Sequence, residues 1–393
     1  VLIDEDLYDK EFVDNYTVGF EPFRQYIMGE EDGQAKTPEW AAEITGLSAS
    51  LIADFARECN EKRTFFAQGW SMQRGDHGEQ PVRMNGALAA LIGDIGRAGG
   101  GVSYGHSYGP TGHPSSGKSS FGGLPAPAQY GDAGGSFIPV AKIADLLLNP
   151  GEEFQYDGNT YTYPETKAVC WMGGNPFHHH QDTNKLIEAW QKPEFVALNE
   201  ITWTPTAEFA DLVIPAAAPM ERRDLVKGAS RTFVASDKAT EPIGEAMTDF
   251  EFYSMVAENL GIGLQYTEGK SKDEWLRQLF EGSDVPMSFD EFFEEGYWTP
   301  EVTQEPRHGF EEFRNDPIEN PLSTPSGKLE ITSNKLQEYD LDDCPAVPKW
   351  IEPDEWVGAD KASEYPFHMM QAHPKYRLHS EFDNTPLLRK HSK

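Results

Sequence analysis

Residues 173–182 read GGNPFHHHQD and residues 203–215 read WTPTAEFADLVIP, and these two stretches decide the fold. The first follows a short apolar run of strand type at 167–172, and the second ends in another. Between them, residues 182–190 place apolar side chains at helical spacing, and residues 195–198 form a further apolar run. Strands that alternate with helices predict an α/β fold with doubly wound, mainly parallel sheets.

Polar residues follow each of these predicted strands. Asn175 and His180 come after the first strand, and Asn199 and Glu200 come at the end of the second. The two glycines before Asn175 have no side chain, so a ligand can come close to the backbone there. Open α/β sheets bind ligands beyond the carboxyl ends of their strands, and the sequence therefore predicts a ligand site at this edge.

A similar unit lies nearer the start of the chain. Residues 65–67 are a predicted strand that leads into the turn 69–74, which contains Trp70 and Arg74. Two interpretations of this pair stay open. The tryptophan is packed beside a solvated arginine, or both side chains contact a ligand at a strand end.

Capping residues and apolar spacing predict several further elements. Helices are expected at 37–61 (in two pieces), 81–95, 138–148, 249–260 and 272–280. Residues 289–317 are acidic, aromatic and predicted to be irregular, and residues 326–331 are a predicted turn into a strand.

Composition excludes several classes of protein. A net charge of -32 makes nucleic acid an improbable partner, because both surfaces are negative, and it also suits a salty medium. No stretch approaches the roughly 20 apolar residues of a membrane span. The three cysteines are far apart, so no disulfide framework, thiolate zinc site or iron–sulfur cluster is expected. The first residues show no export signal.

Residues 112–119 read GHPSSGKS and match the phosphate-binding pattern G-x-x-x-x-G-K-S, with Lys118 as its lysine. That site needs a strand before it and a helix N-terminus after it. Neither flank fits, because residues 102–136 form a long loop rich in glycine, serine and proline. An NTPase is therefore the least favoured function.

The three histidines at 178–180 allow three interpretations: a metal site, a structural turn and a contact to an anionic ligand. The ligand contact is favoured, because adjacent histidines do not easily point at one ion. Residues 373–380 are basic within an acidic chain, which also favours a bound anion, with a solvated turn as the alternative. For residues 221–224, a surface ion-pair cluster is the alternative to a ligand contact.

Taken together, these stretches resemble the molybdenum-containing dimethyl sulfoxide and trimethylamine N-oxide reductases, a family that includes biotin sulfoxide reductase. The resemblance covers nearly the whole chain, and several long motifs come in the right order. They are found at 69–80, 173–184, 203–215, 324–331 and 343–345.

The resemblance implies an oxidoreductase that reduces an S-oxide or N-oxide by oxygen-atom transfer, as in anaerobic respiration. Its cofactors would be bis(molybdopterin guanine dinucleotide) and molybdenum. The implied partners are the small-molecule oxide and an electron donor such as a c-type cytochrome, and the implied location is the periplasm, with the cytoplasm as alternative. The choice among dimethyl sulfoxide, trimethylamine N-oxide, biotin sulfoxide and methionine sulfoxide stays open.

The resemblance also implies which residues contact the cofactor. Trp70, Ser71 and Arg74 would hold one dinucleotide, and residues 371–381 would close over the pterins. Contacts to pterin, guanine or phosphate are implied for Asn175, His180, Asn199, Glu200, Arg222 and Asp249. The closing residues are Gln371, Ala372, His373, Pro374, Arg377, His379, Ser380 and Glu381.

Four departures from the family's pattern matter. The upstream portion that supplies the serine ligand of molybdenum has no counterpart here, and the last domain stops soon after it begins. The segment between Asp224 and Asp249 is short, and Glu381 replaces an expected glutamine. We therefore expect this chain alone to be inactive, and no catalytic residue is assigned. A non-catalytic, cofactor-binding remnant or interaction module is the alternative function.

Three domains are expected. Residues 1–136 form an α/β domain with the long loop, and residues 137–340 form an α/β cofactor-binding domain with an acidic irregular insertion. Residues 341–393 are expected to begin a C-terminal dinucleotide-binding domain, which is a β-barrel in the family.

Overall fold

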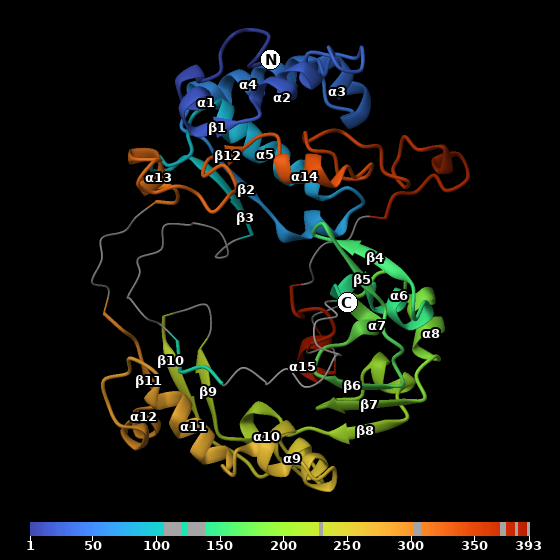
Figure 1. The fold of residues 1–393 in the computed structure, drawn as a ribbon, viewed down its shortest axis with the longest axis vertical. Coiled ribbons are helices and arrows are strands. Elements are labelled where there is room, and N and C mark those ends of the chain that lie inside the picture. Colours follow the sequence, from blue (N-terminus) through green and yellow to red (C-terminus); the bar gives the residue numbers. More distant parts are fainter. Residues whose placement is uncertain are drawn as a thin grey trace. The chain divides into compact units, whose positions relative to one another are not determined.

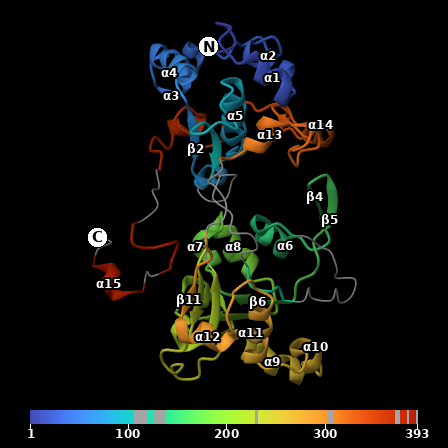
Figure 2. The same cartoon turned by 90° about the vertical axis from the view of Figure 1, so that its left-hand side faces the viewer.

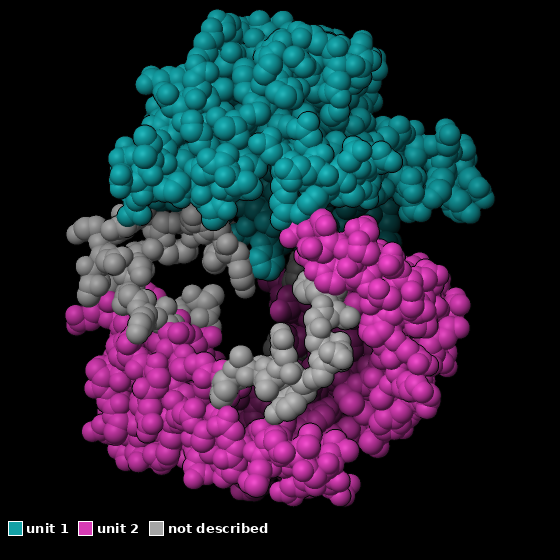
Figure 3. Space-filling view, viewed as in Figure 1, with its two compact units in different colours: residues 1–115, 302–370 teal, residues 116–301, 371–393 magenta. Residues whose placement is uncertain are grey.

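The computed structural model describes residues 1–105, 120–124, 138–227, 231–301, 308–369, 375–381 and 384–390. The chain forms two compact units, which are coloured differently in Figure 3. Unit 1 consists of residues 1–115 and 302–370, and unit 2 consists of residues 116–301 and 371–393. Each unit is thus built from two separate stretches of chain. The division into domains at residues 136 and 340 stays a prediction.

Helices are the main regular secondary structure in the described part of unit 1 (Figures 1 and 2). The expected pair of helices at 37–61 is confirmed, because Thr37 and Ser48 each accept a backbone N–H bond at a helix start. The helices are α1 (Lys10–Tyr16), α2 (Phe20–Ile27), α3 (Pro38–Thr45), α4 (Ala49–Glu61), α5 (Glu79–Leu91), α13 (Glu311–Asn315) and α14 (Asn334–Tyr339), with short 3-10 turns η1 (Trp70–Arg74) and η5 (Asp360–Ser363).

The core of unit 1 forms where α1, α2 and α5 bury their apolar faces together, with Phe12, Phe23 and Ile95 among the most buried side chains. Two short parallel strand pairs flank this core. β2 (Phe65–Gln68) pairs with β3 (Gly101–Tyr104), and β1 (Thr17–Val18) pairs with β12 (Leu329–Glu330). The predicted strand at 65–67 is confirmed by β2, and the predicted strand after the turn at 326 is confirmed by β12.

The central sheet of unit 2 is parallel and has the order β6-β7-β8 (Figure 1). Its strands are β6 (Ala168–Met172), β7 (Phe195–Glu200) and β8 (Leu212–Pro215), as the apolar runs predict. Helices α6 (Ile143–Leu148) and α8 (Thr183–Trp190) bury Leu147, Leu186 and Trp190 against one face of this sheet. The short helix α7 (Pro176–His179) follows β6 directly.

A second core of unit 2 contains phenylalanine rings from an antiparallel sheet and two helices. The sheet has the order β9 (Asp224–Lys227), β10 (Phe233–Ser236) and β11 (Tyr297–Trp298), and the helices are α11 (Lys272–Glu281) and α12 (Phe289–Glu295). The expectation that residues 289–317 are irregular is therefore wrong in part. Ser288 and Glu291 form a capping box at the start of α12, and Phe289 and Phe292 are buried.

The remaining elements of unit 2 are the hairpin β4 (Glu153–Tyr156) and β5 (Asn159–Thr162), the 3-10 turns η2 (Val140–Lys142), η3 (Pro205–Phe209) and η4 (Pro219–Glu221), and the helices α9 (Asp249–Asn259), α10 (Gly263–Thr267) and α15 (Pro386–Arg389). The chain thus has a mixed α/β fold with small sheets, and the described strands close no barrel. None of the helices in the described ranges has the length and apolar character of a membrane span.

Candidate functional site

The carboxyl edge of the sheet β6-β7-β8 gathers the residues that the sequence singles out in unit 2. Met172 is in register with Asn199, and Asn199 with Ile214, so the turns after the three strands begin side by side. Gly174 has a φ of +77°, which glycine adopts without strain, and it starts a sharp turn away from β6. The following residue, Asn175, is 3% exposed.

The side chain of Asn175 joins this edge to the C-terminal segment. Its Oδ1 accepts a hydrogen bond of 2.6 Å from the hydroxyl of Thr206, which is fully buried in η3. Its Nδ2 donates to Oγ of Ser380 over 2.9 Å. The structure therefore brings together two expected cofactor contacts that lie 205 positions apart.

A second chain of bonds starts at the next strand. Asn199 donates from Nδ2 to Oδ1 of Asp249 over 3.2 Å, and its Oδ1 accepts from the hydroxyl of Tyr253 over 3.1 Å. Asp249 is the first residue of α9, where the helix dipole favours a carboxylate. Thr248 and Glu251 cap the same helix start. Burial raises the pKa of Tyr253, so its hydroxyl stays a donor.

Histidine rings lie near the Asn175–Ser380 contact, where the Asn175 backbone N–H donates to Nε2 of His179. The ring of His379 lies 5.5 Å from that of His179 and 6.4 Å from that of His178, measured between centroids. His180 lies against Trp171, and its buried Nε2 has no hydrogen-bond partner. Burial lowers the pKa of His180, which favours the neutral ring. A buried ring nitrogen without a partner is rare in folded proteins, which makes His180 a candidate ligand contact.

The histidines do not form a metal centre by themselves. Among the described residues, no group of three or more His, Cys, Asp or Glu side chains is arranged to hold a metal ion. The ring of His180, the hydroxyl of Ser380 and the carboxylates of Asp249 and Glu200 instead offer donors and acceptors to an organic ligand.

Two further expected residues of unit 2 have local partners. Glu200 ends β7, and its Oε1 accepts a backbone bond of 2.9 Å from Ile201, while burial raises its pKa. Arg222 follows η4, and its Nε lies 3.2 Å from Oδ2 of Asp224, which agrees with the ion-pair interpretation. Glu200 therefore presents an acceptor at the sheet edge, whereas the charge of Arg222 is already partly balanced.

Trp70, Ser71 and Arg74 belong to unit 1. They lie on η1, directly after β2, and all three are exposed. A Cβ added to Gly105 would lie 1.4 Å from Nε1 of Trp70, so only glycine allows the indole ring to pack there. Tyr104 also donates from its hydroxyl to the Trp70 carbonyl over 3.3 Å. A strand end, a fixed indole ring and a free-standing arginine form a surface suited to a planar, anionic ligand.

Other expected contacts lie in the C-terminal segment. Arg377, His379, Ser380 and Glu381 belong to the described turn 375–381, in which the Glu381 N–H donates to the Leu378 carbonyl over 2.8 Å. Gln371, Ala372, His373 and Pro374 lie outside the described residues, as does the stretch 112–119 with Lys118.

Sequence reasoning missed Thr206 and Tyr253. Thr206 lies within the quoted stretch 203–215, and Tyr253 follows Asp249 by one helical turn. These positions in the sequence were the available signals. Neither position shows which asparagine the hydroxyl contacts.

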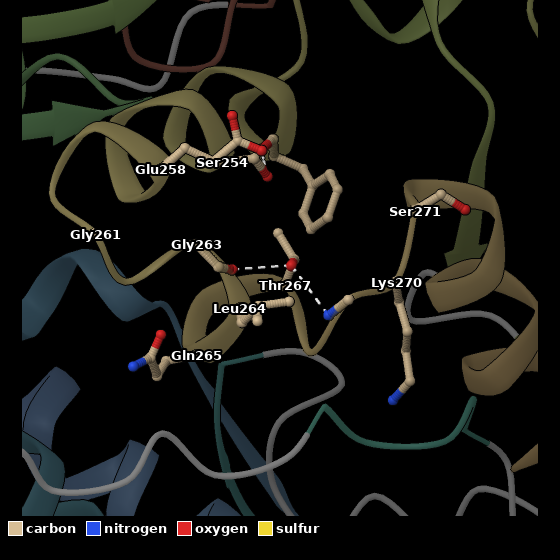
Figure 4. A pocket seen from close by; sticks show the side chains of 11 residues that line it. Ser254, Glu258, Gly261, Gly263, Leu264, Gln265, Thr267, Lys270 and Ser271 are labelled. Atoms are coloured by element: carbon tan, nitrogen blue, oxygen red, sulfur yellow. Dashed lines mark hydrogen bonds between the residues drawn. The ribbon is translucent and has the colours of Figure 1, made fainter.

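A pocket of about 820 Å³ lies elsewhere in unit 2, between α9 and α10 (Figure 4). Its hydroxyl groups are already used within the helices. Ser254 donates to the Phe250 carbonyl over 2.6 Å, and Thr267 donates to the Gly263 carbonyl over 2.9 Å. Lys270 pairs with Glu268. These hydrogen bonds and this ion pair are local, and they join residues at most four positions apart.

Comparisons with known proteins give a consistent result. A family model described as molybdopterin oxidoreductase matches residues 2–259. The chain is 42% identical to the dimethyl sulfoxide/trimethylamine N-oxide reductase of Cereibacter sphaeroides, over 98% of this chain and 49% of that protein. It is 40% identical to the trimethylamine-N-oxide reductase of Haemophilus influenzae, over 100% of this chain and 50% of that protein.

A third relative is the biotin sulfoxide reductase of Cereibacter sphaeroides, at 40% identity over 95% of this chain and 51% of that protein. The chain thus spans about half the length of the curated relatives it matches. Among solved structures, acetylene hydratase from Pelobacter acetylenicus matches with a TM-score of 0.60 and 18% identity, over 99% of this chain and 54% of that one. At this identity the likeness concerns the fold alone.

Proposed function

This chain belongs to the molybdopterin oxidoreductase family, and from that premise we propose that it is the cofactor-binding part of a molybdenum enzyme that reduces S-oxides or N-oxides. Two hydrogen bonds at one sheet edge carry the proposal, one between Asn175 and Ser380 and one between Asn199 and Asp249. Each bond joins segments that are far apart in the chain. Such an edge is where α/β sheets bind large phosphate-bearing ligands.

The residues at this edge fit a molybdopterin guanine dinucleotide. Its guanine and pterin rings present N–H groups, for which the carboxylates of Asp249 and Glu200 are acceptors. Its phosphates and ring carbonyls need donors, which Ser380, His180 and Arg222 supply. The unpaired Nε2 of His180 supports this fit, because a buried ring nitrogen is normally satisfied.

The other expected contacts complete the proposal. Trp70, Ser71 and Arg74 would hold the second dinucleotide, with the indole ring stacked and the guanidinium on a phosphate. Residues 371–381 would cover the pterins. When bound, the cofactor supplies the redox chemistry that removes an oxygen atom from the substrate. The chain's own residues bind and orient the cofactor, and the edge's buried polar groups keep its rings in place.

Finer structural and cellular features also belong to the proposal. We expect the small parallel sheets to be parts of doubly wound sheets, and residues 341–393 to begin the β-barrel domain. We expect an external electron donor, such as a c-type cytochrome, and a periplasmic enzyme of anaerobic respiration. The net charge of -32 supports a positively charged donor, because opposite charges speed association. Fractionation of the native host would place the protein in the periplasm or the cytoplasm.

The proposal is tested with the whole protein that contains this chain, purified from a host supplied with molybdate. We expect molybdenum with two pterins for each metal ion, guanine nucleotide after acid hydrolysis, and oxidation of reduced methyl viologen by a panel of S-oxides and N-oxides. Pterin and metal without turnover would favour a cofactor-binding remnant. Absence of both pterin and molybdenum would refute the proposal.

A further inference from the structure

Asn175 departs from the usual behaviour of an asparagine at its position. It is the N-cap residue of α7, where an asparagine side chain normally accepts a backbone N–H bond from the first helical turn. Here the side chain makes no such bond and turns instead toward Thr206 and Ser380. When a buried N-cap side chain does not make its usual bond to the helix, it is expected to have another role.

Thr206 and Ser380 contact opposite ends of the Asn175 amide. A side-chain amide has an acceptor at one end and donors at the other, and the two ends have nearly the same shape. The Thr206 hydroxyl donates its one hydrogen to Oδ1 over 2.6 Å, in a site that is fully buried. With Oδ1 held in this way, the NH2 group of Asn175 donates to Ser380.

Ser380 is the next group in this chain of hydrogen bonds. Because its Oγ accepts from Asn175, its own hydrogen remains available to donate. Ser380 lies in a tight turn in which His379 has a φ of +51°, a conformation that costs energy for a non-glycine residue. Contacts from outside the turn must stabilise it, and the Asn175 bond is one such contact.

We propose that Thr206 is a positioning residue, which acts through Asn175 to hold the turn 378–381 and to make Ser380 a hydrogen-bond donor. The group that accepts from Ser380 is an oxygen of the bound ligand, a phosphate or a pterin carbonyl. The identity of that ligand rests on the proposed function. The three side chains donate in one direction, from Thr206 to Asn175 to Ser380 and then to the ligand.

The test separates the hydroxyl of Thr206 from its methyl group. Thr206→Val keeps the shape and removes the donor, whereas Thr206→Ser keeps the donor and removes the methyl group. Amide hydrogen exchange of residues 375–381 is measured by mass spectrometry in protein from a host that cannot make molybdopterin. We expect exchange about five to ten times faster in Thr206→Val and close to wild type in Thr206→Ser.

Thr204→Val is the matched control. Its hydroxyl is also buried in this loop but has no hydrogen-bond partner, so its loss should leave exchange of residues 375–381 unchanged. Wild-type exchange in Thr206→Val would overturn the proposal. Equal acceleration in Thr206→Val and Thr206→Ser would also overturn it, because the methyl contact would then be responsible.

Ser380→Ala keeps the proposal testable if Thr206→Val does not fold. Its side chain lies at the outer end of the chain of bonds, and its loss should accelerate exchange of residues 375–381 to a similar extent. Unchanged exchange in Ser380→Ala would contradict the proposal. In pterin-loaded protein, Thr206→Val should lose pterin about tenfold faster than Thr206→Ser.

The two proposals can fail separately. If wild-type protein from a molybdate-supplied host contains no pterin, the proposed function fails. The exchange rates in the cofactor-free protein would still decide whether Thr206 positions Ser380, because that comparison does not depend on a bound ligand.

Discussion

Helix α9 contributes side chains to two regions of unit 2 that use their polar groups in different ways. At the sheet edge, Asp249 and Tyr253 bond to Asn199, about 50 positions away in the chain. In the α9–α10 pocket, Ser254 bonds to a carbonyl only four positions away. A serine within any helix can make such a local bond, whereas bonds between distant segments form only when the fold brings them together. The sheet edge is therefore the better candidate site.

The largest expected effect concerns Asp249. Asp249→Asn should make the loaded protein lose pterin about ten to a hundred times faster, because a hydrogen bond to a charged acceptor is worth roughly 1.5–3 kcal/mol. Pterin fluorescence after repeated gel filtration measures the loss. Glu258→Gln, on the pocket side of the same helix, is the control and should change retention less than about twofold. Equal losses would remove the distinction between the two regions.

A smaller effect is expected at Tyr253. Tyr253→Phe removes the hydroxyl that orients Asn199 and should lower the free energy of unfolding by about 1 kcal/mol. Urea unfolding monitored by circular dichroism measures this. Ser254→Ala, whose hydroxyl serves only its own helix, should stay within about 0.5 kcal/mol of wild type. A larger loss in Ser254→Ala than in Tyr253→Phe would contradict the comparison.

The backbone at the two regions should also respond differently. Gly174→Ala should cost about 1 kcal/mol, because the φ of +77° is unfavourable for any residue with a Cβ. The added Cβ would lie 3.6 Å from Nε2 of His179, an ordinary contact, so conformation alone sets the cost. Gly263 in the pocket has no positive φ, and any cost of Gly263→Ala comes from space, because the added Cβ would lie 2.9 Å from Cγ and 3.3 Å from Cα of Glu258. Thermal unfolding should show a midpoint below that of wild type for Gly174→Ala.

The smallest expected effect is a pH dependence from His180. Its pKa in the folded protein lies below the ordinary 6.5, so the unfolded chain binds the proton first as pH falls. The stability contribution is therefore complete above pH 6.5 and is lost as pH falls toward the folded pKa. Urea unfolding from pH 8 to 5 should show a steeper loss in wild type than in His180→Gln. Parallel curves would show that the ring is not held neutral.

Glu200, at the same edge, should give a pH dependence of stability that is opposite in sign to that of His180. Burial raises its pKa above the ordinary 4.5, so the folded protein keeps the proton longer than the unfolded chain as pH rises. The stability that this group contributes is therefore lost as pH rises from 4.5 to the folded pKa. Glu200→Gln should remove this slope without affecting the one from His180.

The strands and most helices could be predicted because their signals are local. Residues 167–172 and 195–198 are apolar runs bounded by polar turns, and Thr37 and Ser48 are recognisable caps. The helix at 289–295 was missed, although Ser288 and Glu291 carry a capping signature, because its acidic and aromatic composition resembled an irregular segment.

The candidate site was predictable only in part. Asn175, Asn199 and Glu200 could be placed at one edge, because parallel strands end on the same side. Asp249 was expected only through the family resemblance, and Ser380 through that resemblance and the basic run 373–380, since no local pattern links either residue to the sheet. Thr206 and Tyr253 act through single hydroxyl contacts, and such contacts depend on the distance between segments that are far apart in sequence.

The interleaved path of the chain has a consequence for how the protein is made. Thr17 pairs with Leu329, so unit 1 needs two strands that the ribosome delivers roughly 300 residues apart. At typical rates of synthesis that interval lasts on the order of tens of seconds. During this time the N-terminal helices of unit 1 lack the second stretch of the unit, residues 302–370. The parallel sheet of unit 2, in contrast, has all three strands within one short stretch of nascent chain. This sheet should therefore acquire protease resistance before unit 1 does during translation.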